Sequence, residues 1–142
     1  MYKALDIANY VINKEGQMGH SVSNLKLQKI LYFIQAEFLV VKGIPCFEEE
    51  IIAWGFGPVV LEVYHEYKVY GAAGIPVFFK KKNPYILKED KILINNILDD
   101  VREYSSSTLT NITLCQTPWK ESYVPKQDRP IRRKLIKEYF TD

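Results

Sequence analysis

The sequence predicts a mainly α fold: a single compact helical domain with a small β-hairpin or a short antiparallel β element. Apolar residues recur at helical spacing over most of the chain, and turn-forming residues separate these stretches. One β-rich stretch, IPVFFKKKNPYIL, contains an Asn-Pro turn that favours a hairpin. The 142 residues suffice for one core and are short for two, so we expect one domain over residues 1–142.

Helical periodicity places two helices in the N-terminal third. The spacing of apolar residues predicts a first helix at about residues 3–14, which Gly16 is expected to end. Ser23 or Asn24 is expected to cap the second helix by accepting a hydrogen bond from one of its free amides. This second segment, LKLQKILYFIQAEFLVVKG, is the strongest helix prediction and the expected centre of the core. Its apolar face consists of Leu27, Ile30, Leu31, Ile34, Phe38 and Val41.

The middle of the chain mixes strand and turn signals. PCFEEEIIAW predicts a short strand, although its three glutamates would also suit the first turn of a helix. Gly57 and Pro58 predict a turn followed by a helix, with Pro58 at the first helical position, where its missing amide proton costs nothing. This helix is expected to end at Gly71. The residues expected along one of its faces are Val60, Tyr64 and Tyr67.

The C-terminal half returns to helix. KEDKILINNILDDVREY predicts a helix with Ile94, Ile97, Leu98 and Val101 facing inward. Ser107 is expected to cap a shorter helix. The apolar residues of that helix are Leu109, Ile112 and Leu114. CQTPWKESYVPKQDRP predicts a loop, and Pro130 is expected to open a last helix, IRRKLIKEYF.

Composition excludes several classes of protein. The net charge of +2 argues against a general nucleic-acid coat but leaves room for a local basic patch. Cys46 and Cys115 show no metal-binding spacing and suit a reducing compartment. The N-terminus lacks the features of a signal peptide, and no apolar run approaches the roughly 20 residues that cross a bilayer. We expect a soluble, cytoplasmic protein without a membrane partner.

The residues offer little for catalysis. The chain has no phosphate-binding glycine-rich loop, no paired CxxC, no HExxH and no nucleophile elbow. Glu62 and His65 have metal-like spacing, but such a site needs a second copy, and a solvated helix face accounts for both. Cys46 and Cys115 lack an evident base and suit small apolar positions. We expect no enzyme, no cofactor and no metal; a hydrolase or metalloenzyme is the least favoured alternative.

Basic residues crowd the last helix and the segment before it. They could neutralise phosphates in a nucleic acid, form a solvated face, or attract an acidic protein partner. The expected patch consists of Arg129, Arg132, Arg133, Lys134 and Lys137, with Lys126 nearby.

Aromatic residues exceed what a core of this size needs. Ten Tyr, seven Phe and two Trp make up 13% of the chain, and tyrosine is common at protein interfaces. On the second helix, Gln28, Tyr32, Gln35 and Leu39 form a second stripe beside the apolar face. This stripe suits a contact surface; equally, Tyr32 could close the edge of the core with its hydroxyl in solvent.

The segment at residues 25–71 resembles the Panacea domain, also called the SocA-like antitoxin domain of bacterial and phage-associated proteins. Its blocks are LKLQKxLYF, a Gly-x-Pro turn, an acidic stretch ending in Ala-Trp, and Gly-Pro-Val leading into a Tyr-rich helix. Weaker similarity reaches TPWKES, giving a core signature of about 5–122, followed by a basic helix at 123–142. The resemblance implies an antitoxin without enzymatic activity that neutralises a cognate toxin by direct binding.

The chain departs from the family pattern at two places. Family members usually have a basic or polar residue and an aromatic between the Trp and the Gly-Pro, where this chain has Gly55 and Phe56. Many members carry Thr-His before the late Pro-Trp, where this chain has Cys115 and Gln116. We interpret AWGFGPVV as a rigid turn that fixes Trp54 and orients the following helix.

Two hypotheses of function follow. The first is a protein-binding antitoxin. The second is a DNA-binding regulator or autorepressor acting through the basic C-terminal helix; a homodimer is compatible with either. The expected partner-binding residues are Lys29, Tyr32, Gln35, Trp54, Phe56, Gly57, Pro58, Tyr64 and Tyr67.

Overall fold

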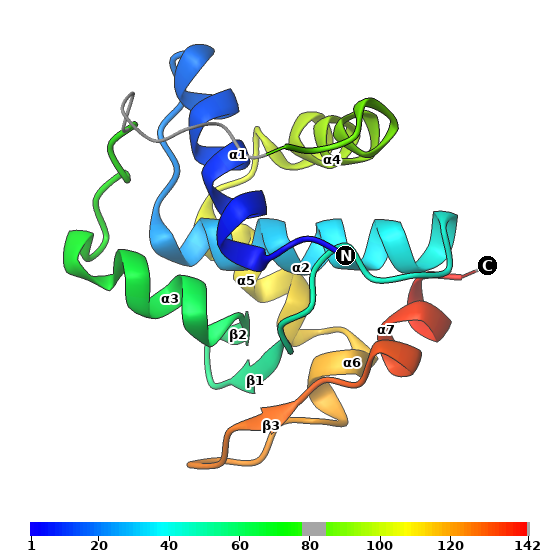
Figure 1. Cartoon of the computed structure of the whole chain (residues 1–142). Coiled ribbons are helices and arrows are strands. Elements are labelled where there is room, and N and C mark those ends of the chain that lie inside the picture. The colour runs from blue at the N-terminus through cyan, green and yellow to red at the C-terminus, as the bar shows by residue number, and fades with distance from the viewer. Residues whose placement is uncertain (78–84, 142) are drawn as a thin grey trace.

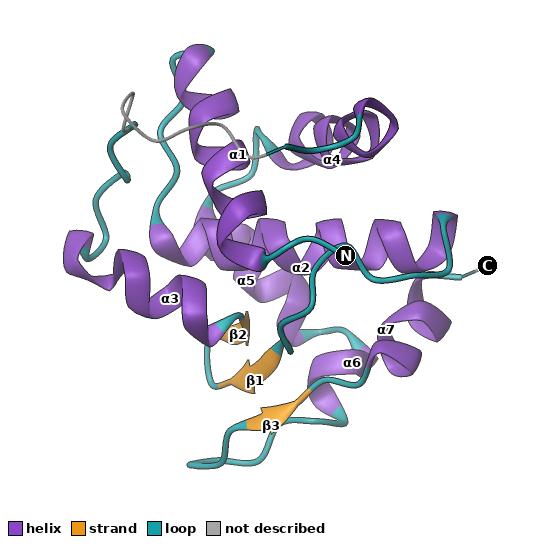
Figure 2. Ribbon diagram, viewed as in Figure 1, coloured by secondary structure: helices purple, strands orange, loops and turns teal. Residues whose placement is uncertain are grey.

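The computed structural model describes residues 1–77 and 85–141. Most of the elements are helices, and they are accompanied by one small antiparallel sheet (Figure 1, Figure 2). This confirms the predicted mainly α fold class. The elements are α1 (Ala4–Gln17), α2 (Asn24–Val41), β1 (Ile52–Trp54), β2 (Gly57–Val59), α3 (Leu61–Tyr67), the 3-10 turn η1 (Lys68–Tyr70), α4 (Lys88–Val101), α5 (Ser106–Leu114), α6 (Thr117–Lys120), β3 (Arg129–Pro130) and α7 (Arg133–Phe140).

Helix α2 is the centre of the molecule, as predicted. It crosses the middle of Figure 1 and contacts α1, α3, α4, α5, α7 and β2. The apolar face predicted from the sequence is buried, with the exception of Val41, which is 55% exposed. Val41 is exposed because it is the last residue of α2.

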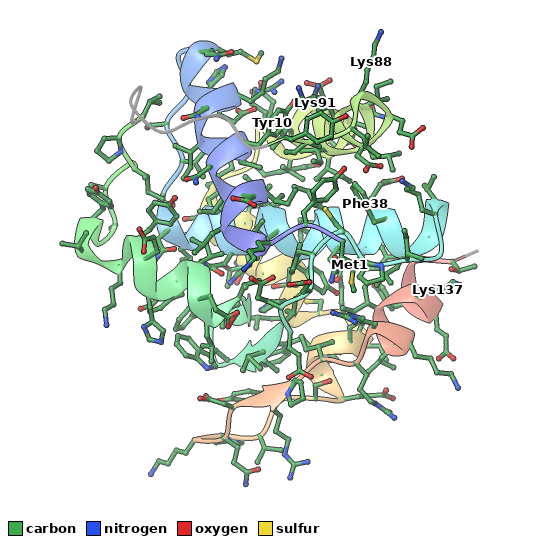
Figure 3. The ribbon with its side chains drawn as sticks, in the orientation of Figure 1. Met1, Tyr10, Phe38, Lys88, Lys91 and Lys137 are labelled. Carbon is green, nitrogen blue, oxygen red and sulfur yellow. The ribbon has the colours of Figure 1, made fainter. Side chains whose placement is uncertain are left out.

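Helices α1 and α4 lie on the same side of α2 in Figure 1. Figure 3 shows Tyr10 of α1 beside Lys91 of α4, with the lysine Nζ 6.0 Å from the centroid of the tyrosine ring. The Tyr10 hydroxyl donates a hydrogen bond of 2.7 Å to the Oδ1 of Asn95. Four apolar residues of α4 face inward as predicted: Ile94, Ile97, Leu98 and Val101.

The predicted end of the first helix is wrong, because α1 continues through Gly16 to Gln17. A Cβ on Gly16 would lie 2.1 Å from the Cγ2 of Val77. Gly16 therefore permits the close approach of a distant segment. The positive φ, +79°, occurs instead at Gly19.

The sheet is built around the hairpin of β1 and β2. Trp54 pairs with Gly57, so Gly55 and Phe56 form the loop between the strands, and β3 joins the other edge of β1. The predicted role of Pro58 is wrong: it lies in β2, and α3 begins only at Leu61. Proline is tolerated there because β2 is an edge strand.

Other predictions in this region are partly met. The strand predicted within PCFEEEIIAW is confined to β1, because residues 46–50 form no strand. The turn of the hairpin predicted at residues 75–87, Asn83-Pro84, lies outside the described residues. Its described flanks, 75–77 and 85–87, contain no strand.

Capping residues show how local chemistry selects helix ends. Ser23 caps α2, as predicted, by accepting a hydrogen bond of 3.2 Å from the amide of Lys26. The cap of α5 is Ser105 rather than Ser107, since its hydroxyl accepts a hydrogen bond of 3.1 Å from the Thr108 amide. Ser105 precedes the first helical residue, where an N-cap must lie, whereas Ser107 is already inside the helix.

The C-terminal segment also differs from its prediction. Helix α6 occupies part of the predicted loop, and Pro130 lies in β3 instead of opening the last helix. Helix α7 begins at Arg133, after Ile131 has entered the core at 3% exposure. On α5, Leu109 is buried, whereas Ile112 is 37% exposed, and the other buried residue of this helix is Thr113.

Within residues 1–77 and 85–141, no helix combines the length and the apolarity required to traverse a bilayer.

Candidate functional site

An aromatic cluster occupies the tip of the β1–β2 hairpin and the adjoining face of α3. The ring of Trp54 lies 5.0 Å from the ring of Tyr64 and 5.5 Å from the ring of Phe56, both in edge-on geometry. Phe56 is 38% exposed, and the side chains of Trp54 and Tyr64 are half-buried. We call these three residues the hairpin aromatic cluster. It combines large apolar area with polar ring atoms, a combination enriched at protein interfaces.

Contacts from the C-terminal segments hold Trp54 in place. Its indole Nε1 donates a hydrogen bond of 2.8 Å to the Oδ1 of Asp128. Its carbonyl accepts a hydrogen bond of 2.7 Å from the Nε1 of Trp119, whose ring stacks on Tyr123 at 4.8 Å. These partners were missed by sequence reasoning, because they are more than 60 residues away along the chain. Such long-range pairing leaves no local pattern in the sequence.

Lys29 lies beneath the cluster with no exposed surface. Its Nζ donates a hydrogen bond of 3.0 Å to the carbonyl of Pro58 and lies 5.4 Å from the centroid of the Phe56 ring. Burial lowers the pKa of the Lys29 ammonium to about 7, because the charged form loses its hydration. The predicted partner-binding residues Lys29, Phe56 and Pro58 are thus brought together in space.

Gly57 is required by this arrangement. Its φ is +110°, and a Cβ at this position would lie 2.8 Å from the Cε of Lys29 and 2.9 Å from the Oγ1 of Thr113. The hairpin can therefore approach α2 and α5 only with glycine at this place. Neither loop residue, Gly55 or Phe56, has a positive φ, so the turn is not one of the primed types.

The polar residues of the second stripe on α2 bind the chain's own backbone and side chains. Gln35 accepts hydrogen bonds of 2.8 and 3.2 Å from the amides of Cys46 and Phe47. Gln28 accepts one of 2.8 Å from the amide of Val60. We call Gln28, Lys29, Tyr32 and Gln35 the polar stripe of α2; all four are buried.

One of the two interpretations from the sequence required the Tyr32 hydroxyl to lie in solvent, and this interpretation is wrong. Tyr32 is completely buried, and its hydroxyl donates a hydrogen bond of 2.7 Å to the Oε1 of Gln116. Burial raises the pKa of the Tyr32 hydroxyl. Gln116 occupies one of the positions where this chain departs from the family pattern, and its side chain accepts the hydrogen bond of the Tyr32 hydroxyl.

Tyr67, another predicted partner-binding residue, is also internal at 2% exposure. Its hydroxyl donates a hydrogen bond of 2.6 Å to the Oδ1 of Asn9, and burial raises its pKa to about 12. Of the nine predicted residues, Trp54, Phe56 and Tyr64 reach the surface, and the other six are buried. The sequence did indicate that the α2 residues are buried. This helix carries only three charged residues in 18, as expected of a helix surrounded by protein.

The predicted basic patch is distributed over two elements. Arg129 lies in β3, whereas Lys137 lies where α7 meets the end of α2, with its Nζ 3.9 Å from the position of a Cβ on Gly43 (Figure 3). Arg133 donates a hydrogen bond of 2.7 Å to the carbonyl of Glu48. Lys134 lies 4.0 Å from Glu138.

Acidic residues accompany these basic ones. A cavity of about 330 Å³ is lined by Arg132 and Arg133 together with Glu48, Glu49 and Glu50. Carboxylates beside the arginines weaken attraction for a phosphate backbone. DNA binding through the last helix stays a prediction from the sequence.

The residues considered from the sequence for a metal site or a nucleophile do not form such a site within the described ranges. Glu62 and His65 lie on the exposed side of α3, and the described ranges 1–77 and 85–141 contain no group of three or more metal-ligating side chains. Cys46 is buried, and burial raises the pKa of its thiol, whereas Cys115 is exposed. A raised pKa makes a thiol a poorer nucleophile at neutral pH.

Comparisons with known proteins agree with the resemblance seen in the sequence. A family model described as "Antitoxin SocA-like, Panacea domain" matches residues 27–120. The protein named Antitoxin SocA from Caulobacter vibrioides is 42% identical over 65 residues, which cover 46% of this chain and 35% of that protein. The match thus spans about a third of the relative's length. No solved structure matches the chain.

Proposed function

The chain belongs to the family of antitoxin SocA-like Panacea domains, and from this premise we propose that it neutralises a cognate toxin by direct protein–protein binding. The family match over residues 27–120 carries the proposal. The matched range contains both the hairpin aromatic cluster and the polar stripe of α2. The toxin itself is proposed only as a class, a protein partner.

The hairpin aromatic cluster is the proposed contact surface. Large aromatic side chains at the centre of an interface provide much of the binding energy when they are desolvated. Phe56 is 38% exposed at the tip of a hairpin that is constrained by the backbone of Gly57 and by the contacts of Trp54 with the C-terminal segment. A rigid loop loses little entropy on binding, so its apolar area contributes more fully to affinity.

The proposal requires no catalytic step and no cofactor. Neutralisation would follow from occupying the toxin's surface stoichiometrically. It also places the protein in the cytoplasm, where reducing conditions keep both cysteines as the free thiols seen in the structure.

Co-expression tests the proposal. The product of the adjacent gene is induced alone and together with this chain, and growth is followed in both cultures. We expect inhibition of growth by the gene product alone, rescue by co-expression, and a complex that survives purification. A harmless gene product together with the absence of a complex would remove the support for an antitoxin.

Two matched aromatic substitutions locate the surface. Phe56→Ala is expected to weaken the complex by about 10-fold or more, because residues that anchor an interface typically contribute above 1.4 kcal/mol. Tyr85→Ala removes an aromatic ring that is 84% exposed but outside the cluster, and it should leave affinity unchanged. Equal effects of the two substitutions would place the contact surface elsewhere.

A further inference from the structure

Lys29 differs from the other buried charged residues of the described chain. Three charged side chains are buried there: Glu15, Lys29 and Asp90. Glu15 pairs with Arg102 at 2.7 Å, and Asp90 pairs with Lys42 at 2.7 Å. Lys29 forms no ion pair with any residue in 1–77 or 85–141, although it is the most deeply buried of the three. Of these three buried side chains in 1–77 and 85–141, Lys29 is therefore the one that lacks an ion-pair partner.

The one hydrogen bond that Lys29 forms within the described residues leaves most of its donor capacity unused. An ammonium group has three donors, and the structure gives Lys29 one acceptor, the carbonyl of Pro58. Removing an uncompensated ammonium from water is unfavourable, and the lowered pKa of Lys29, about 7, reflects that loss. A position that served only packing would be filled more favourably by an apolar side chain of the same length.

The groups that face Lys29 carry no opposing charge. The hairpin presents the Phe56 ring and the Pro58 carbonyl, and α5 presents the hydroxyl of Thr113 near the same point. On α2, Lys26 and Tyr32 lie three residues before and after Lys29, and they bind the Arg102 carbonyl and Gln116. No carboxylate, histidine or thiol is among these neighbours, and burial is the cause of the pKa shift.

Phe56, at the tip of the β1–β2 hairpin, is a partly exposed residue in contact with Lys29. The Lys29 Nζ lies over the Phe56 ring, 5.4 Å from its centroid, and Phe56 is 38% exposed. The Phe56 ring makes an edge contact with Trp54 and lies tilted against Tyr64, with ring centroids 5.5 and 6.3 Å away.

We propose that Lys29 is the buried half of a binding site for a carboxylate of the partner protein, covered by Phe56 in the free chain and reached when that ring moves aside. The inference rests on the proposed function. One unpaired cation matches one monovalent anion, whereas a phosphate dianion would need further donors that the described neighbours do not supply. The aromatic rings around the opening would enclose the apolar stem that bears the carboxylate.

Proton uptake on binding is the first test. Calorimetric titration of the intact chain with the product of the adjacent gene is carried out at pH 8 in two buffers of different ionisation enthalpy. Lys29 with a pKa of about 7 is mostly neutral at pH 8, and pairing with a carboxylate would restore its charge. We expect a net uptake of protons, the greater part of one per wild-type complex. No uptake by a complex that does form would overturn the proposal.

Substitution of Lys29 is the second test. Lys29→Met removes the charge and retains the length, so the free protein should melt at the same temperature or higher, while partner affinity falls about 30-fold or more. The proton uptake should vanish with it. Lys26→Met is the matched control: it removes a lysine one turn earlier, whose Nζ is held by the Arg102 carbonyl, and should change affinity less than about twofold.

Changes in the partner protein identify which of its carboxylates binds Lys29. Removal of the partner's last residue and single Asp→Asn or Glu→Gln substitutions separate a terminal carboxylate from a side chain. The correct change should reduce affinity in the wild type and have little further effect in Lys29→Met, because the two groups would then be coupled.

A further measurement needs no partner. Reductive methylation with formaldehyde, followed by mass spectrometry, reports how readily each lysine amine is reached. We expect Lys29 to react much more slowly than the exposed lysines in the wild type and at a rate approaching theirs in Phe56→Ala. Equal protection in both proteins would show that Phe56 is not the cover.

The outcomes separate this inference from the proposed function. If the wild type binds the gene product, and Lys29→Met binds within twofold and without a change in proton uptake, the antitoxin proposal stands and the carboxylate site is rejected. If the wild type does not bind at all, both are rejected.

Discussion

Single residues determine how closely the hairpin approaches α2. Gly57 combines a φ of +110° with neighbours that leave no room for a Cβ, so two separate constraints act at one position. Gly19 has a φ of +79° but no heavy atom within 4 Å of a Cβ at that position. The two glycines therefore separate the effect of backbone conformation from the effect of close contact.

Alanine at each glycine measures these two effects. Gly19→Ala should cost about 1 kcal/mol, the strain of a left-handed conformation. Gly57→Ala should cost about 3 kcal/mol or more, because overpacking adds to that strain. Urea denaturation with a common m-value checks both. Equal costs would show that Lys29 and Thr113 move aside freely.

The sequence identified Gly57 as structural but assigned Pro58 to the wrong element. Gly-Pro followed by a helical pattern predicts proline at the start of the helix, and the hairpin register that places Pro58 opposite Ala53 depends on β1. Similarly, Lys29 is one of several lysines in the sequence; its unpaired burial depends on which elements surround it.

At the scale of elements, α2 organises the molecule through two different faces. One face buries apolar side chains, and the other, the polar stripe of α2, satisfies the amides of segments that have no secondary structure of their own. Gln35 binds the amides of both Cys46 and Phe47, where residues 46–50 form no strand. Buried backbone amides require such partners, so the polar stripe determines where these segments can lie.

Replacement of Gln35 tests this role. Gln35→Leu leaves two buried amides without an acceptor and should destabilise the protein by about 2–6 kcal/mol, at about 1–3 kcal/mol for each unsatisfied group. Thermal and urea unfolding measure the loss. Glu37→Gln, on the same helix and half-buried, should change stability by less than about 0.5 kcal/mol. A small effect of Gln35→Leu would mean that water replaces the amide oxygen.

At the scale of the whole molecule, the C-terminal segment completes the structure around the hairpin. Strand β3 pairs with β1, and the Ile131 amide donates a hydrogen bond of 2.7 Å to the carbonyl of Ile51. Ile131 and Ile136 are buried at 3% and 0% exposure. Asp128 binds the indole of Trp54 from the same segment. The region beyond the family match therefore supports the matched region.

Truncation after residue 122 should remove this support. Loss of two buried isoleucines alone would cost about 3–6 kcal/mol, at 1.5–3 kcal/mol each, against a typical domain stability of 5–15 kcal/mol. We expect a large fall in melting temperature or the loss of a cooperative transition, followed by circular dichroism. Truncation after residue 140, which leaves α7 intact, is the control and should change little. An unchanged melting temperature on removing residues 123–142 would show that they are peripheral.

The sequence by itself determined the helical class, the central position of α2, its serine cap and the family, because each depends on periodicity or on ordered local blocks that lie within one stretch of chain. Tertiary structure alone decided that the polar stripe of α2 faces inward, that Pro58 and Pro130 lie in strands, and that Lys29 is buried without an ion pair to any residue in 1–77 or 85–141. These features depend on partners that are distant in sequence, such as Pro58 for Lys29 and Gln116 for Tyr32. Burial and hydrogen-bond satisfaction are properties of the assembled neighbours, and a local pattern does not contain them.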